Sequence, residues 1–406
     1  WWKPSDPASG HMTAATQFHL LPLAGERTLR LTLKHHAFNV FTQPDEDLWT
    51  FDRTGRLLGM YVNGVNYRRT LDNRFVRKSR EMIEGETYRE VSLIPWKEAE
   101  NLLAQSHHLL EQAQNLPAGF ADMARKVLAR KMDDLEEEGE RFRRIYLPVT
   151  ILPPDQYMAL VLQITEGCNY NLCTFCNFYR DRPFRIKSMP EVEEHITRVL
   201  DFFAAGLTLR KSVFLADANA LATPQERLVS FLEMIRTKIP QRRVYSFIDV
   251  FTGLKKTAED FARLKTLGLQ RVYLGVESGS ADLLELLNKP QLTEDVIQLA
   301  ESLKAGGLDL GLIFLAGAGG KKYHGAHLAE SLELVRRLPL GKGDIVYISE
   351  FYETNREYNR VLKEVKASLP ERKDVRRMAV EFNREMRTVV PIGTAVSVYD
   401  IQQFLY

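Results

Sequence analysis

From Met158 onward, short apolar runs alternate with amphipathic stretches, and this alternation constrains the fold more than any other feature of the chain. The short runs are rich in β-branched and aromatic residues, which is typical of buried strands, whereas the longer stretches repeat apolar residues at helical spacing. Alternating strands and helices predict parallel βα units. The predicted strands are 158–165, 212–217, 243–249, 270–276, 309–315 and 344–349, and the predicted helices lie near 190–205, 225–238, 257–267, 293–305 and 326–337.

All three cysteines of the chain, Cys168, Cys173 and Cys176, lie within nine residues directly after the first predicted strand. Glu166-Gly167 ends the strand pattern, so the thiols lie on a loop and can converge on one soft-metal centre. Thiolates suit iron–sulfur clusters, zinc or copper. Structural zinc normally takes four protein ligands, and the chain has no fourth cysteine. We therefore favour a three-cysteine iron–sulfur cluster that leaves one iron open to a substrate or cofactor.

Three cysteines on one loop can also serve other purposes. A zinc site completed by a histidine stays open as an alternative. A disulfide is disfavoured, because one cysteine would be left over and the chain shows no secretory signal. Free thiols indicate a reducing compartment, so we expect a cytoplasmic protein. No apolar run approaches the length of a membrane span, and we expect no membrane partner.

The cysteine pattern resembles that of the radical S-adenosylmethionine (SAM) enzymes. Their usual signature is C-x3-C-x2-C after the first strand of a partial (β/α)6 barrel, with an aromatic residue before the last cysteine. Phe175 fills the aromatic position, while the first gap is four residues instead of three. The resemblance covers about residues 155–350. It implies an α/β fold with that partial barrel, a [4Fe-4S] cluster on the three cysteines, and SAM as a cofactor next to Phe175.

Polar residues follow the carboxyl ends of the predicted strands, where the chemistry of βα barrels gathers. Asp217 follows the second strand and resembles the family residue that accepts the SAM amino group, although the usual Gly-Gly-Glu motif is absent. A helix N-cap at Asn219 or Thr223 is the structural alternative there. Asp249 follows the third strand, where binding of substrate or of the SAM ribose and capping of a helix both stay open.

The fourth strand ends in Gly275-Val-Glu277-Ser278-Gly279-Ser280, which resembles the family sequence Gly-Val-(Glu/Gln)-Ser-Gly-Ser. A carboxylate can accept hydrogen bonds from both ribose hydroxyls, and glycines permit close approach of the backbone. The resemblance therefore implies that Glu277 and Ser278 bind SAM, while Ser280 suits a helix N-cap. Lys289 resembles the cation that meets the SAM carboxylate, and a simply exposed lysine is the alternative.

Two residues are candidates for substrate chemistry. The predicted loop after the fifth strand contains His324 and His327, and its place at the rim makes one of them a candidate acid or base. A structural histidine is the alternative. The last predicted strand leads into Glu350-Phe-Tyr352, which could face the same cavity. We take His324 and Tyr352 as candidate catalytic residues.

The rest of the chain is expected to form additions to this barrel. Residues 1–11 have the composition of an expression tag, so the native sequence starts near Met12. Residues 12–150 predict an N-terminal α+β domain, residues 151–352 the barrel, and residues 353–406 a C-terminal extension of helix and a terminal strand, 395–399. The N-terminal domain is expected to hold strands at 29–33, 48–52, 57–63 and 88–93 and helices at about 97–115 and 119–142, the second ending in an acidic, solvated run, 133–140.

The resemblance implies that the protein cleaves SAM reductively and that the resulting 5′-deoxyadenosyl radical abstracts hydrogen from a substrate, with electrons from a donor such as flavodoxin or ferredoxin. All three cysteines are committed, which disfavours auxiliary clusters, and the region before residue 150 does not resemble a cobalamin-binding domain. We expect rearrangement, epimerisation, decarboxylation or coupling of a small molecule.

Two alternatives stay open beside the small-molecule enzyme. One is an RNA-modifying radical SAM enzyme, suggested by the basic segments 67–80 and 372–387. The other is a non-catalytic, metal-stabilised nucleic-acid-binding module. The overall charge does not separate them, because 55 Lys and Arg residues stand against 53 Asp and Glu residues.

Overall fold

The computed structural model describes residues 16–83, 86–353, 355–404 and 406, so the predicted tag at residues 1–11 lies outside the described part. The chain divides into two compact units. The first extends to Arg144 and also includes Phe202–Leu209 and Tyr406. The second comprises Ile145–Asp201 and the chain from Arg210 onward.

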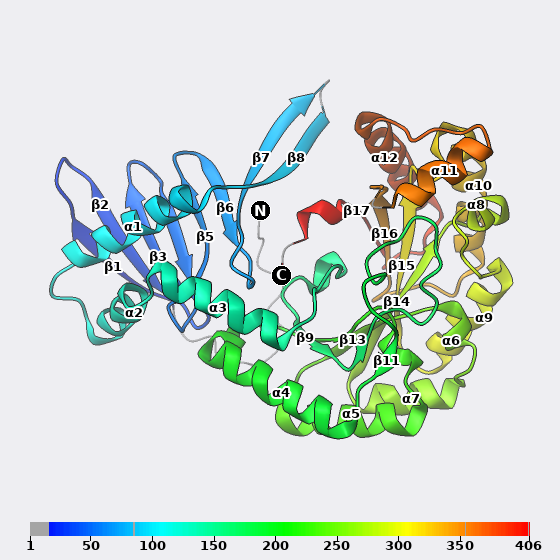
Figure 1. Ribbon diagram of the computed structural model, residues 1–406, viewed down its shortest axis with the longest axis horizontal. Helices are drawn as coiled ribbons and strands as arrows, with labels where there is room; N and C mark the ends of the chain where they lie inside the picture. Colours follow the sequence, from blue (N-terminus) through cyan, green and yellow to red (C-terminus); the bar gives the residue numbers. More distant parts are fainter. Residues whose placement is uncertain (1–15, 84–85, 354, 405) are drawn as a thin grey trace. The chain divides into compact units, whose positions relative to one another are not determined.

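The first unit is built on an eight-stranded antiparallel sheet in which each strand pairs with the next one in sequence (Figure 1). Asn63 and Gly64 form the tight turn between β5 and β6, and both have positive φ, 50° and 77°, as a two-residue hairpin turn requires. The strands are β1 (Gln17–Pro22), β2 (Thr28–Leu33), β3 (Phe38–Gln43), β4 (Leu48–Phe51), β5 (Leu57–Val62), β6 (Val65–Arg69), β7 (Phe75–Ile83) and β8 (Glu86–Leu93).

Three helices pack against one face of this sheet and enclose the core of the unit: α1 (Trp96–Gln112), α2 (Ala118–Leu128) and α3 (Met132–Ile145). Leu29 and Trp49 from the sheet lie in the same buried cluster as Leu102 of α1 and Met123 of α2. Trp49 also donates a hydrogen bond from Nε1 to the carbonyl of Leu102 at 2.8 Å. This bond satisfies the indole N–H, which would otherwise be buried without a partner.

The single helix predicted at 119–142 is wrong, because the chain forms the two helices α2 and α3 there. Arg130 lies between them and reaches back to the sheet, where its Nε donates to the carbonyl of Thr54 at 3.0 Å. The sequence between the two helices contains no glycine or proline that would have predicted the break. It is a consequence of tertiary contacts, which local helix propensity does not report.

The predicted solvated face at 133–140 is also wrong at one position, because Glu138 is buried. Arg56 and Arg130 donate to its Oε1 at 2.8 and 3.0 Å, and a guanidinium nitrogen of Arg69 lies 2.9 Å from Oε2. Burial alone would raise the pKa of Glu138, but attraction by the three guanidinium groups outweighs it and lowers that pKa. One ionised carboxylate therefore bridges three converging guanidinium groups.

The second unit is built on a seven-stranded parallel sheet with the order β17-β16-β15-β14-β13-β12-β9. All six strands predicted for the barrel are present and follow one another across the sheet in sequence order. The seven strands are β9 (Leu160–Gln163), β12 (Val213–Ala216), β13 (Val244–Ile248), β14 (Leu269–Glu277), β15 (Asp309–Ala316), β16 (Ile345–Glu350) and β17 (Ala395–Tyr399). This α/β architecture confirms the predicted fold class.

Helices follow the strands of this sheet, as the alternation predicted: α4 (Met189–Phe203), α5 (Gln225–Lys238), α6 (Val250–Gly253), α7 (Ala258–Thr266), α8 (Ala281–Leu286), α9 (Thr293–Ala305), α10 (Gly320–Arg337), α11 (Arg356–Glu364) and α12 (Arg372–Val389). Helix α10 begins at Gly320, earlier than predicted. His324 and His327 therefore lie on a helix, and the loop predicted around them is wrong. Among the described residues, no helix is both long and apolar enough to cross a membrane.

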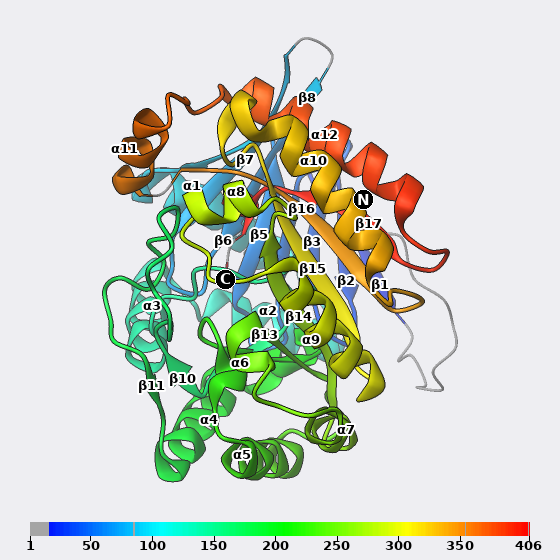
Figure 2. The ribbon, with the colours of Figure 1, turned by 90° about the vertical axis from the view of Figure 1, so that its right-hand side faces the viewer.

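The seventh strand comes from the C-terminal extension. β17 pairs with β16 in parallel, from Ile345 opposite Ala395 to Ser349 opposite Tyr399. Two parallel neighbours need a crossover connection, and α12 provides it by packing against β15, β16 and β17. Figure 2 shows α12 beside α10. The extension is therefore part of the sheet that carries the barrel.

The Glu138 cluster gives a test of the first unit. Replacing Glu138 with Ala removes the carboxylate partner of buried Arg69 and the closer of the two carboxylate partners of Arg56, so we expect a loss of about 3–5 kcal/mol in the free energy of unfolding. The measurement is urea unfolding, with the exposed neighbour Glu137→Ala as the matched control.

The pH dependence follows from the lowered pKa of Glu138. Its stabilising effect is complete above the ordinary value of 4.5 and is lost as the pH falls through the lower folded value. The difference between wild type and Glu138→Ala should therefore be full at pH 7 and shrink in acid. Equal stability of both proteins at pH 7 would contradict the assignment.

Candidate active site

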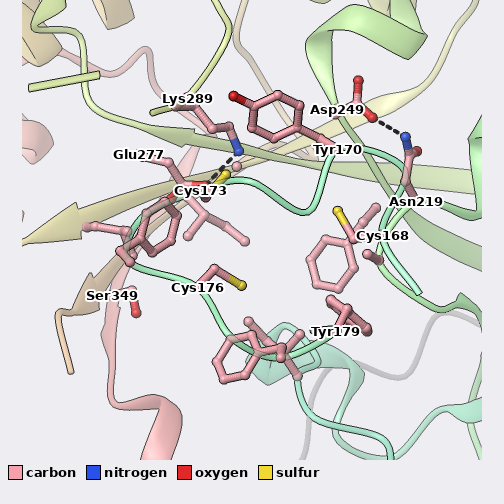
Figure 3. Close-up of a pocket in the computed structure, with 18 of the residues that line it drawn as sticks. Cys168, Tyr170, Cys173, Cys176, Tyr179, Asn219, Asp249, Glu277, Lys289 and Ser349 are labelled. Carbon is pink, nitrogen blue, oxygen red and sulfur yellow. Dashed lines mark hydrogen bonds and ion pairs between the residues drawn. The ribbon is translucent and has the colours of Figure 1, made fainter. Parts of the chain in front are cut away.

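A cavity of about 460 Å³ lies at the carboxyl ends of the parallel strands of the second unit. Most of its lining is apolar or aromatic, from residues such as Phe247, Ile313 and Phe351. Polar side chains enter from several strand ends and from the loop that carries the cysteines (Figure 3). Enclosure by apolar walls with a few convergent polar groups is the usual form of a small-molecule site.

The three cysteines line this cavity together, as the loop prediction required. Figure 3 shows Cys168, Cys173 and Cys176 around one open region. Burial raises the pKa of the Cys173 thiol to about 12 and also raises that of Cys176. These thiols are therefore protonated until a metal displaces their protons, since metal ligation requires the thiolate.

One end of the cysteine loop is fixed by Asp217, which follows β12 and is buried. Its Oδ2 accepts hydrogen bonds from the backbone N–H of Gly167 at 3.1 Å and from Nε of Arg182 at 3.2 Å. Gly167 precedes the three cysteines in the chain and Arg182 follows them. Gln163 donates to Oδ1 at 3.0 Å. Burial raises the pKa of Asp217, and the Arg182 cation opposes that effect. The carboxylate thus joins the two ends of the loop.

Gly167 has little freedom at this junction. Its φ is +73°, which favours glycine, and a Cβ added there would lie 2.7 Å from the carbonyl oxygen of Pro183. The loop is closed at the same place by a short antiparallel pair, β10 (Thr165–Glu166) and β11 (Arg185–Ile186).

The middle of the loop is held by the chain that follows α8. The backbone N–H of Thr174 donates to the carbonyl of Leu287 at 3.1 Å. Asn288 donates from Nδ2 to the carbonyl of Leu172 at 2.9 Å, and the Tyr170 hydroxyl donates to the carbonyl of Asn288 at the same distance. The loop is therefore fixed on two sides by elements that are distant in sequence.

Glu277 and Lys289 form a buried ion pair at the wall of the cavity, with 3.0 Å between Oε1 and Nζ. Burial lowers the pKa of Lys289, but the Glu277 carboxylate outweighs it, so the net shift is upward and Lys289 stays charged. Gly275 makes this pair feasible, because a Cβ there would lie 2.5 Å from Oε1 of Glu277. The two residues that the resemblance assigned to separate parts of SAM thus contact each other.

Asp249 also lines the cavity, and the structure shows its capping role directly. Its Oδ1 accepts the backbone N–H of Thr252 at 2.6 Å and so caps α6. Its Oδ2 accepts hydrogen bonds from the side-chain amides of Asn219 and of Asn169, the latter at 3.1 Å. Asn219 makes no side-chain cap of its own. Asn169 lies on the cysteine loop, so this network ties the loop to the ends of β12 and β13.

Asp217, Ser278 and His324 are not among the described residues that line the cavity. Ser278 is buried behind β14, where its hydroxyl donates to Nδ1 of His327 at 2.7 Å, while Nε2 of His327 donates to the carbonyl of Leu315 at 3.1 Å. Burial lowers the pKa of His327 to about 3, which keeps the ring neutral in this tautomer. His324 instead contacts Glu381 of α12 at 3.0 Å.

The glycine after Ser278 also has a structural use. A Cβ on Gly279 would collide with the carbonyl oxygen of Glu330 in α10. This glycine therefore permits the close approach of a helix of the same unit. The family resemblance had implied that it permits the close approach of a bound nucleoside.

Phe175 and Tyr352 line the cavity as predicted. Ser349 and Glu350, at the end of β16, line it as well. Tyr399 of β17 lines it too. The sequence missed Tyr399, because its strand was expected to lie outside the barrel. The alternating pattern of 395–399 predicted a strand, but no local feature of the sequence indicated which strand it would pair with.

Among the described residues, no three His, Cys, Asp or Glu side chains are grouped closely enough to hold one metal ion. A four-iron cluster makes a different demand, because each thiolate binds its own iron. Three thiols around a shared space, together with the lack of a tetrahedral group, fit such a cluster better than zinc.

Comparison with known proteins agrees with this geometry. Residues 162–335 match the Radical SAM superfamily. The chain is 27% identical over 217 residues to 4'-phospho-dehydrooxetanocin synthase of Priestia megaterium, an alignment that covers 48% of this chain and 28% of that protein.

Similar solved structures include coproporphyrinogen III oxidase from Escherichia coli, with 15% identity, a TM-score of 0.41, and coverage of 56% of this chain and 52% of that one. Methylornithine synthase has 14% identity, a TM-score of 0.39, and coverage of 73% and 85%.

Residues 162–335 are therefore a radical SAM domain. This superfamily implies SAM and a [4Fe-4S] cluster as cofactors of the domain.

The anchoring of the loop can be tested at Asp217. If its carboxylate holds the loop, Asp217→Ala should release both ends of the loop and leave the buried Arg182 without this carboxylate partner. The amount of iron retained after anaerobic reconstitution should then fall, although every cysteine is intact. The control is Asp181→Ala, which removes an exposed partner of the same arginine.

The alternative role gives a different result. A residue that only binds the SAM amino group would leave iron content unchanged in Asp217→Ala and weaken SAM binding alone. Iron analysis and SAM binding on the same preparations separate the two readings.

Proposed function

We propose that this protein cleaves SAM reductively at a [4Fe-4S] cluster held by Cys168, Cys173 and Cys176 and abstracts hydrogen from a small-molecule substrate. The observation that supports this most directly is the position of the thiols. They line one cavity together with a buried carboxylate–ammonium pair, Glu277 and Lys289.

The residues of this chain would hold and shield the reactants. When bound, the cluster and SAM supply a carbon-centred radical that removes a hydrogen atom from the substrate. Glu277 would accept hydrogen bonds from the ribose hydroxyls of SAM, and Lys289 would meet the SAM carboxylate, a group of the same charge type as its present partner Glu277. Asp249 would hold the Asn169 side of the loop in place, and Phe175 would cover the cluster. The apolar lining would exclude water from the radical.

The substrate would occupy the wall formed by β16 and β17. Ser349, Glu350 and Tyr399 offer it hydrogen-bonding groups, and Tyr352 lies half-exposed at that side. We place a small molecule there because the cavity is enclosed, and the name of the similar synthase from Priestia megaterium supports this class. The reaction would be a rearrangement, epimerisation, decarboxylation or coupling. An electron donor such as flavodoxin or ferredoxin and a cytoplasmic location complete the proposal.

The cluster assignment predicts that anaerobically reconstituted protein contains about four irons per chain. Replacing Cys168, Cys173 or Cys176 with Ala should abolish the visible absorption of the cluster, because each thiolate is needed to hold it. Leu172→Ala, at an exposed side chain of the same loop, is the control and should keep the iron. Full iron in any single cysteine variant would refute the assignment.

The cofactor role of Glu277 is tested apart from the cysteines. Glu277→Ala should weaken SAM binding by about tenfold to a hundredfold, since a charge-assisted hydrogen bond contributes about 1.5–3 kcal/mol. The cluster should remain, and Glu285→Ala on the exposed face of α8 serves as the control. The measurements are SAM affinity and 5′-deoxyadenosine formation at matched iron content. Unchanged values in both would show that Glu277 is structural.

A further inference from the structure

The sheet of the first unit has a second face, which points away from its helices. Strand pairing places residues on this face in rows across the sheet. One row runs from Leu20 through Arg30 and Phe41 to Leu48. It continues through Tyr61, Asn66 and Lys78. A parallel row joins Thr32, Asn39, Thr50, Gly59, Arg68 and Val76. We call the residues of these rows and their strand neighbours at period two the outer face.

The outer face carries positive charge and no negative charge. Arg30, Arg68, Lys78 and Arg80 occupy it, on β2, β6 and β7. Within the described strands, no Asp or Glu stands at an outward position, because those of β7 and β8 alternate onto the other side. This separation of charge is local, since the chain as a whole carries a net charge of only +2.

Carboxylates do lie at the margin of the outer face. In the loop between β3 and β4, Asp45 is already engaged by Arg27 at 2.7 Å. Asp47 of the same loop is buried and accepts the backbone N–H of Asn63. The outward strand positions themselves carry only cations, which favours attraction of anionic ligands to this face.

Aromatic side chains stand among these cations. Phe18 is 62% exposed and Tyr61 is 39% exposed, while Phe41 is half-buried between them. The guanidinium of Arg30 lies 5.4 Å from the centre of the Phe18 ring. Neighbouring strands are about 4.8 Å apart, so Phe41 and Tyr61, separated by β4, are about 10 Å apart along their row. The face therefore presents ring surfaces at intervals with cations between and beside them.

We propose that the outer face binds single-stranded nucleic acid. Exposed rings are platforms on which unpaired bases stack, and arginines and lysines beside them attract the phosphates that link those bases. A duplex hides its base faces and so offers nothing to the rings. The proposal concerns binding alone and does not depend on the reaction in the barrel.

The test uses the full-length protein without SAM and fluorescently labelled 20-mers of uridine, of thymidine and of a matched duplex. Fluorescence anisotropy should show saturable binding of the single strands and much weaker binding of the duplex. Comparison of the affinities for the uridine 20-mer and the thymidine 20-mer distinguishes a preference for RNA from a preference for DNA. With four cations engaged, the logarithm of the affinity should fall with the logarithm of salt concentration at a slope of about 3, which is about 0.7 for each phosphate neutralised on a single strand.

Variants separate charge from stacking. Arg80→Ala and Arg68→Ala should each reduce the salt slope by about 0.7. The matched control is Arg77→Ala, because Arg77 is exposed on the same strand but on the opposite face. Tyr61→Leu should weaken binding by about fivefold to a hundredfold with little change in the salt slope. Each variant is first compared with wild type in its unfolding midpoint.

Several outcomes would overturn the proposal. One is the absence of saturable binding at low salt. Another is equal weakening by Arg77→Ala and Arg80→Ala. A third is equal affinity for duplex and single strand with no effect of Tyr61→Leu, which would reduce the interaction to unspecific attraction of a polyanion. Failure here would leave the iron and SAM measurements on the barrel unaffected.

Discussion

The site depends on the bonds of one buried carboxylate, Asp217, to Gly167 and Arg182. A loop that brings three thiols together has few internal contacts, so its shape must be imposed from outside. Asp217 joins its two ends, and the backbone after α8 fixes its middle. Breaking such a buried pair costs more than an exposed one, because the remaining charge cannot be hydrated. The sheet positions Asp217, and through it the sheet positions the thiols.

The same logic applies to the pair of Glu277 and Lys289. Either charge alone would be costly inside an apolar cavity. The Glu277 carboxylate keeps Lys289 charged before any ligand is present, so Lys289 does not have to gain a proton when a zwitterionic ligand arrives. The pair therefore offers one cation and one anion to charged groups in the cavity, while the net charge of the pair itself is zero.

The periodic features of the sequence predicted the barrel well, because buried strands and amphipathic helices are local patterns. All six predicted strands exist, and Cys168 and Glu277 share one cavity as expected. The failures have a common cause in long-range contacts. Arg130 breaks a helix by reaching the sheet, Glu138 is buried by arginines from other elements, and β17 joins β16 across the whole of α12. Ser278 and Gly279 matched a motif, yet their contacts with His327 and Glu330 serve packing between β14 and α10.

The position of β17 has a consequence for the order of events during synthesis. The ribosome produces Cys168 early and Tyr399 late, yet both belong to one cavity. While the chain is growing, the thiols are already made and the wall at β17 is still missing. Domains fold as units once their residues are available, so the finished enclosure forms only after Tyr399 has emerged. Iron delivered before that moment meets an open loop, whereas iron delivered afterwards must enter through the mouth of a folded protein.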